Sequence, residues 1–174
     1  MTVDFPASFM LVAAMNPCPC GYFTDPRKPC KCTAPQIDKY LARISGPLVD
    51  RIDIHLEVPA VSFSELRSDR DGTPSSAMRE QVLAARDRQA RRFAPDPLMV
   101  NGRMRSRLLR KHCKLDQAGE TILRQAMTEL GLSARAHDKI LRVARTIADL
   151  AGVEDLTAEH VAEAIHYRRL DRQL

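Results

Sequence analysis

Residues 133–152, SARAHDKILRVARTIADLAG, decide how most of this chain folds. The apolar side chains of this stretch recur every three or four residues, which places them on one face of an α-helix. They are Ala136, Ile140, Val143, Ala144, Ile147 and Ala151. Ser133 is a residue type that caps helix N-termini, and Gly152 is one that ends helices. We predict an amphipathic helix over residues 134–151 that packs against further helices.

Helical patterns continue on both sides of this stretch. They predict helices at about residues 76–92, 104–113, 116–130 and 158–169. The residues that stand where caps or stops are expected are Ser75, Asp116, Gly131 and Thr157. Residues 69–74, DRDGTP, precede all these helices and mark a domain boundary. We therefore expect an all-α bundle over residues 73–174.

Residues 1–72 have a different pattern. Residues 9–15 are continuously apolar, as in a strand of a parallel sheet covered on both faces, and residues 52–58 alternate apolar and polar, as in a half-exposed strand. A helix is predicted from about residue 34 to residue 44, with Thr33 as its cap. The expected fold is an α/β fragment followed by an all-α helical bundle, mainly α overall.

Charge is distributed unevenly along the chain. The 174 residues contain 27 Lys or Arg and 22 Asp or Glu, a formal charge of +5. Residues 1–72 carry 8 basic and 9 acidic side chains, whereas residues 73–174 carry 19 and 13. A polyanionic partner is therefore expected to bind the second part first. No apolar run approaches the ~20 residues of a membrane span, and the N-terminus does not resemble a signal peptide, so we expect no membrane association and a cytoplasmic location.

Four of the five cysteines form a C-x-C…C-x-C pattern between residues 18 and 32. In a reducing cytosol, clustered thiols are more often metal ligands than disulfides, and four thiolates suit tetrahedral zinc. We predict a structural Zn²⁺ held by Cys18, Cys20, Cys30 and Cys32. C-x-C is tighter than the usual zinc knuckle, so a reduced, metal-free loop is the alternative. The fifth thiol, Cys113, is expected to be a passive buried residue.

Three polar residues are candidates for chemistry. Asn16 follows the apolar run 9–15, and ligands bind beyond the carboxyl ends of parallel strands, but an Asn can also cap the following turn. Arg51 stands between a helix stop and a predicted strand and suits phosphate oxygens, unless Asp50 or Asp53 pairs with it. Arg135 begins the helix at 134–151, where a cation is slightly disfavoured, so it either meets an anion or is an ordinary surface residue.

Residues 103–114 form a basic run without an acidic residue. If the run is helical, one face carries Arg103, Arg107, Arg110 and Lys114, and this face could follow a phosphate backbone. The alternative is a solvated charged face, and no interleaved aromatic residues support base stacking.

Three sequence strings together resemble the magnesium-chelatase-like AAA+ ATPases of bacteria, in particular the ComM/YifB type. They are AAMNPCPCGY at 13–22, ISGPLVDRIDIH at 44–55 and LSARA at 132–136. The resemblance implies that residues 1–72 are the C-terminal part of an AAA+ P-loop core and residues 73–174 the helical lid. It also implies that Asn16 is the sensor-1 residue, Arg51 the arginine finger and Arg135 the sensor-2 residue. Such proteins are expected to form homo-hexameric rings that use ATP and Mg²⁺ and act on DNA in branch migration.

The sequence departs from that family in one respect. It contains no G-x-x-x-x-G-K-[ST] string and no apolar strand ending in Asp-Glu, so the phosphate-binding loop and the magnesium-holding carboxylates are absent. The chain is expected to start within the ATPase domain and not to hydrolyse ATP by itself. The alternatives are a zinc-stabilised DNA-binding module, a fragment of a true magnesium chelatase ATPase subunit, and a fragment that only oligomerises.

Overall fold

The computed structural model describes residues 3, 7, 9–61, 63, 67, 72–96 and 98–168. Contacts divide the chain into two compact units, Met1–Arg43 and Ile44–Leu174. Helices dominate the described residues, so the mainly α fold that the sequence predicts is confirmed. Residues 69–71 of the predicted domain boundary lie outside the described residues.

The first unit consists of the cysteine loop followed by helix α1 (Ala34–Leu41). Thr33 caps this helix as predicted: its side chain and that of Gln36 form a reciprocal capping box, and the Thr33 N–H donates to Gln36 Oε1 at 2.9 Å. Ile37 is the buried residue of α1. Among the described residues of this unit few other apolar side chains are buried, so the cysteine loop makes up much of the interior that they form.

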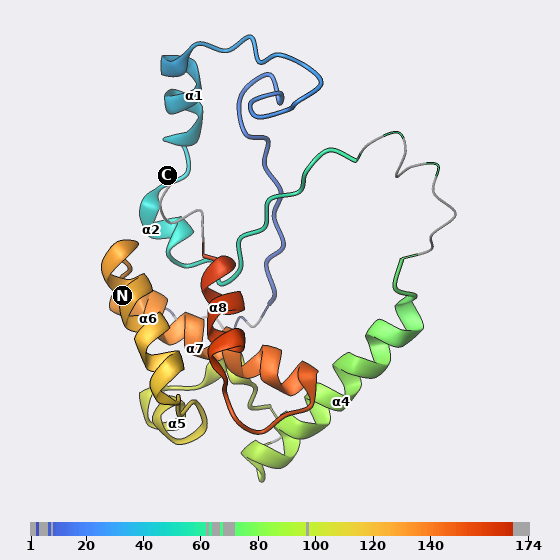
Figure 1. Ribbon diagram of the computed structural model, residues 1–174, viewed down its shortest axis with the longest axis vertical. Helices are drawn as coiled ribbons and strands as arrows, with labels where there is room; N and C mark the ends of the chain where they lie inside the picture. Colours follow the sequence, from blue (N-terminus) through green and yellow to red (C-terminus); the bar gives the residue numbers. More distant parts are fainter. Residues whose placement is uncertain are drawn as a thin grey trace. The chain divides into compact units, whose positions relative to one another are not determined.

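The second unit carries the helical bundle, and its elements follow the predicted ranges closely (Figure 1). Its helices are α2 (Gly46–Val49), α4 (Ser75–Phe93), α5 (Ser106–His112), α6 (Gln117–Glu129), α7 (Ala134–Ala151) and α8 (Ala158–His166), with a 3₁₀ turn η1 (Asn101–Arg103). Ser133 Oγ accepts the Ala136 N–H at 3.1 Å, and Asp116 caps α6 in the same way through Gly119 at 2.7 Å. Helix α7 ends at Gly152, whose φ of +82° is the left-handed conformation that favours glycine.

Helix α7 is the centre of the bundle. It contacts α4, α5, α8 and η1, and α6 packs against α8. The predicted apolar stripe supplies fully buried positions, with Ile140 and Ala144 both 0% exposed. Cys113 is buried next to them and directs its thiol toward the Leu141 carbonyl, and burial raises its pKa to about 11. The thiol is therefore a passive core group, as predicted.

Both predicted strands are wrong. Residues 9–15 and 52–58 form no strand, and within the described ranges the structure has only an isolated bridge between Leu115 and Leu156. In the second segment the His55 N–H donates to the Tyr167 carbonyl at 2.8 Å. Apolar side chains expected to be buried are exposed, including Phe9 at 81% and Val12 at 83%. In the second segment His55 is buried while Leu56 is 65% exposed, the reverse of the expected alternation. A strand forms only when a neighbouring strand pairs with it, and the described residues supply no such partner strand.

Candidate functional site

The four clustered cysteines come together in a tight loop of the first unit. The turn is closed by the Gly21 N–H, which donates to the Cys18 carbonyl at 3.0 Å, and Gly21 has a φ of +81° that side chains rarely adopt. Sγ of Cys18 lies 3.4 Å from that of Cys20 and 3.7 Å from that of Cys30, and all four Sγ atoms lie within 4.8 Å of one another. Tetrahedral zinc with bonds of about 2.3 Å separates its sulfur ligands by about 3.8 Å. The four thiols, that of Cys32 among them, are therefore close enough together to bind one metal ion.

The loop backbone already prepares one thiol for metal binding. Backbone N–H groups of Tyr22 and Lys31 lower the pKa of Cys20 to about 6, because hydrogen bonds to sulfur favour the thiolate. The Cys32 N–H donates to Cys30 Sγ at 3.4 Å and opposes the rise of the pKa of Cys30 to about 12, which comes from burial and from the neighbouring thiols. Metal binding would thus release protons from the remaining thiols.

Asn16 lies next to this loop, with its side chain beside Gly21. It is exposed, and its side chain forms no hydrogen bond with the described residues. The hydrogen bond found at the following turn joins the Gly21 N–H to the Cys18 carbonyl, and no bond from Asn16 to this turn is found among the described residues. The amide is available to a ligand.

Arg51 follows helix α2 in the second unit. Its guanidinium donates to the Pro47 carbonyl at 2.7 Å and is exposed, and it forms no ion pair with a described carboxylate. The alternative in which Asp50 or Asp53 neutralises Arg51 is wrong, because both carboxylates are engaged elsewhere. The arginine is held at its base by the α2 turn and presents its charge to solvent.

Asp50 connects the Arg51 segment to two other elements. One carboxylate oxygen accepts the Ser133 hydroxyl at 3.1 Å, and the carboxylate pairs at 3.8 Å with Arg135 and with Arg168. Arg168 is 1% exposed and also donates to the Ile52 carbonyl. The sequence offered no signal for these pairings, since Asp50 and Ser133 are 83 residues apart.

The first turns of α7 complete this junction. Lys139 pairs with Asp53 at 3.0 Å and donates to the backbone carbonyl of Arg51. Arg135 remains 75% exposed despite its contact with Asp50. The structure thus brings two of the three predicted nucleotide-sensing residues, Arg51 and Arg135, to one junction within the second unit.

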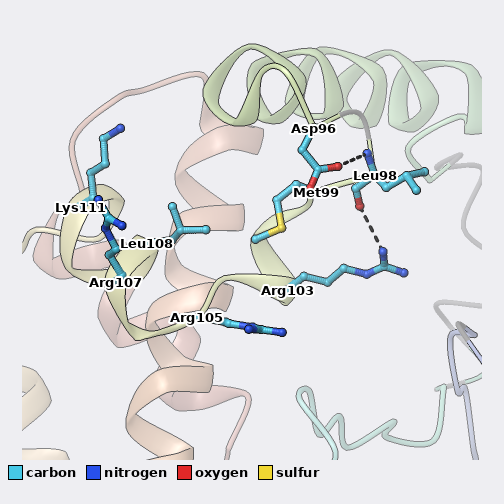
Figure 2. Close-up of a pocket in the computed structure, with 8 residues that line it drawn as sticks. All are labelled: Asp96, Leu98, Met99, Arg103, Arg105, Arg107, Leu108 and Lys111. Atoms are coloured by element: carbon cyan, nitrogen blue, oxygen red, sulfur yellow. Dashed lines mark hydrogen bonds between the residues drawn. The ribbon is translucent and has the colours of Figure 1, made fainter. Parts of the chain in front are cut away.

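The predicted basic face is not a continuous helix. Helix α5 spans only Ser106–His112, so Arg103 lies in η1 and Lys114 lies beyond the helix end. Arg103 and Arg107 do line a shared cleft, together with Arg105 and Lys111, which the helical pattern did not select (Figure 2). The turn between η1 and α5 brings these cations together, and a helical projection cannot represent such a turn.

No helix in the part of the chain that the structure describes combines the length and the apolar character that crossing a membrane requires.

Comparison with known proteins gives two family matches. Residues 1–66 match the model described as magnesium chelatase, subunit ChlI, and residues 72–168 match the model of the C-terminal region of the same subunit. The chain is 40% identical over 173 residues to the competence protein ComM of Haemophilus influenzae and 39% identical over 173 residues to YifB of Escherichia coli. These alignments cover 99% of this chain but 33% of each relative, so the chain spans about a third of their length.

Proposed function

Because the chain belongs to the magnesium chelatase ChlI family, we propose that it is the C-terminal portion of a ring-forming AAA+ ATPase of the ComM/YifB kind, which remodels DNA in the cytoplasm. In this proposal the chain supplies Asn16 as sensor 1, Arg51 as arginine finger and Arg135 as sensor 2. ATP and Mg²⁺ bind to the whole protein, because the phosphate-binding loop is not among these 174 residues.

The observation that carries the proposal is the state of Arg51. An arginine finger must reach a phosphate on a neighbouring subunit, so its charge has to be exposed, anchored at its base and not neutralised within its own subunit. Arg51 meets these conditions: it is exposed, bonded to the Pro47 carbonyl, and adjacent to two carboxylates that other cations occupy.

The contact between Asp50 and Arg135 supports the role of Arg135. The guanidinium is mostly exposed and its 3.8 Å contact is longer than a close charge-assisted hydrogen bond. A nucleotide phosphate with two charges competes well for such a cation. Binding of nucleotide would then break the contact between Asp50 and Arg135, and Asp50 would keep its contacts with Ser133 and Arg168.

The test is Arg51→Ala in the protein that carries this chain together with a phosphate-binding loop. ATP hydrolysis should fall about 10³-fold or more, because the finger stabilises charge in the transition state, while nucleotide affinity changes little. The matched control is Arg79→Ala, an exposed arginine in the first turns of α4, and it should retain normal turnover. Near-normal hydrolysis by the Arg51 variant would remove the residue from the mechanism and the proposal with it.

A structural Zn²⁺ in the cysteine loop is a second proposal. It is supported by the mutual approach of the four Sγ atoms and by the scarcity of other buried side chains in Met1–Arg43. Small units with little apolar core commonly depend on a metal for stability. Elemental analysis of the purified chain should find about one zinc per chain. A metal-free protein with four freely reactive thiols would disprove the site.

A further inference from the structure

The second unit contains a cleft between η1 and α5, the η1–α5 cleft. Its lining residues are Asp96, Leu98, Met99, Arg103, Arg105, Arg107, Leu108 and Lys111, and its volume is about 720 Å³. Figure 2 shows Leu108 and Met99 facing each other across it, with Arg107 and Lys111 on the α5 side. On the η1 side, the Arg103 and Arg105 side chains point away from α5 (Figure 2). Cations therefore flank a short apolar floor.

The charge of this cleft is not balanced by its own residues. Four of the eight lining residues are cationic and one is anionic, and the Asp96 carboxylate already accepts the Leu98 N–H at 3.0 Å. Arg105, Arg107 and Lys111 are exposed and form no ion pair or side-chain hydrogen bond with any described residue. A concave surface with several uncompensated cations concentrates anions by focusing the electrostatic field.

The walls of the cleft are fixed by buried contacts. Asn101, at the start of η1, is 1% exposed; its backbone N–H donates to Gln89 Oε1 at 3.0 Å and its side-chain amide donates to Asp149 at 2.7 Å. The Met104 carbonyl, directly before Arg105, accepts the Arg142 Nε–H at 3.0 Å. The backbone that carries these cations is therefore ordered before any ligand binds, which lowers the entropic cost of binding.

The lining chemistry indicates which anion fits. No lining residue is aromatic and none is Asn, Gln, Ser or Thr, so the cleft offers no platform for stacking a base and no neutral side-chain group for reading its edge. Guanidinium and ammonium groups bind phosphate oxygens, and they do so without regard to base sequence. We propose that the η1–α5 cleft binds the phosphate backbone of DNA, through Arg105, Arg107 and Lys111.

This inference deepens the proposed action on DNA and rests on it. It places the contact in the second unit, on residues other than Arg51 and Arg135. It also selects between two subsets of the basic run: Arg107 and Lys111 line the cleft, whereas Arg110 and Lys114 do not. The two subsets have equal charge and lie in the same short segment, so each serves as the control for the other.

The test measures binding of the 174-residue chain to a fluorescein-labelled 20-nucleotide oligo-dT by anisotropy, between 50 and 200 mM NaCl. The cleft variant is Arg107→Gln with Lys111→Gln, and the matched variant is Arg110→Gln with Lys114→Gln. Losing two phosphate contacts should reduce the slope of log K against log salt by about 1.4 and lower affinity at 50 mM salt by roughly 10- to 100-fold. The matched variant should lose much less. All four side chains are exposed, so unfolding midpoints should stay unchanged.

Several results would overturn the inference. An unchanged affinity in the cleft variant would show that the cleft does not touch DNA, and equal losses in the two variants would show a diffuse basic surface. If polyglutamate displaces the labelled oligo-dT at the same concentration as unlabelled oligo-dT, the ligand is an acidic polypeptide. Inorganic phosphate that displaces the labelled oligo-dT at constant ionic strength would identify a small-anion site. Hydrolysis by the Arg51 variant is measured separately, so failure of the cleft leaves the ATPase proposal standing.

Discussion

Replacing Asp149 by alanine is expected to destabilise the helical bundle severely. Asp149 lies in the last turn of α7 and is 0% exposed. Its carboxylate accepts hydrogen bonds from Arg92 of α4 at 2.7 Å and from Asn101 of η1 at 2.7 Å, and it pairs with Arg145 at 3.2 Å. Three elements of the bundle therefore meet at one buried carboxylate.

The magnitude follows from what the substitution leaves behind. Removing one partner of a buried ion pair typically costs about 3–5 kcal/mol, because the remaining charge stays buried without compensation. Arg145 is 3% exposed and so cannot regain full hydration after the loss of Asp149. The matched control is Asp87→Ala, which removes an exposed i,i+4 pair with Arg91 in α4, where such pairs contribute about 0.3–0.5 kcal/mol.

The assay is urea unfolding of both variants, followed by circular dichroism at 222 nm. Asp149→Ala should lower the free energy of unfolding by several kcal/mol, and Asp87→Ala should lower it by less than about 0.5 kcal/mol. The slope m should stay similar if both native states keep their compactness. A loss in Asp149→Ala no larger than that in Asp87→Ala would refute the reasoning that the buried cluster holds α4, η1 and α7 together.

The same carboxylate gives a pH dependence with a defined sign. Burial opposes ionisation of Asp149, but hydrogen bonds from Arg92 and Asn101 outweigh it and hold the pKa of Asp149 below its usual value. A lowered pKa in the folded state means that the stabilisation is complete above the unfolded pKa of about 3.9 and is lost as the pH falls through the lower, folded value. Asp149→Asn should remove this loss of stability at low pH, measured as the free energy of unfolding against pH. If the free energy of unfolding of Asp149→Asn falls with acid as steeply as that of the unchanged protein, Asp149 is not the group whose protonation destabilises the fold.

Two further predictions concern the cysteine loop and a helix end. Cys18→Ser with Cys32→Ser should abolish zinc retention and lower the melting temperature of the first unit, measured by elemental analysis and calorimetry, and an identical melting curve would argue against a structural metal. Gly152→Ala should cost about 1 kcal/mol, because its φ is +82° and an added Cβ would lie 3.0 Å from the Arg88 guanidinium. Gly102→Ala, where a Cβ would meet nothing within 4 Å, should cost much less in the same unfolding experiment, and equal losses would contradict the strain argument.

The helices were predictable because their signals are local. Caps, stops and the three-to-four-residue spacing lie within each segment, so α7 has the predicted bounds and α4 and α6 differ from theirs by one residue at each end. The strands failed for the opposite reason. A strand is stabilised by partners elsewhere, and the pattern of residues 52–58 does not reveal whether those partners are present. Burial of His55 in place of its apolar neighbours is the result.

The sequence by itself determined the helical segments, the four cysteines that can meet at one metal, and the identity of Asn16, Arg51 and Arg135 as candidates, because residue type and spacing along the chain carry that information. Only the tertiary structure decided which charges are paired. Ser133 and Arg168 contact Asp50, and the adjacent Arg51 forms no ion pair with a described carboxylate. The turn between η1 and α5 likewise places Arg105 and Lys111 around one cleft. Such pairings depend on distances through space, which follow from packing and not from chain order.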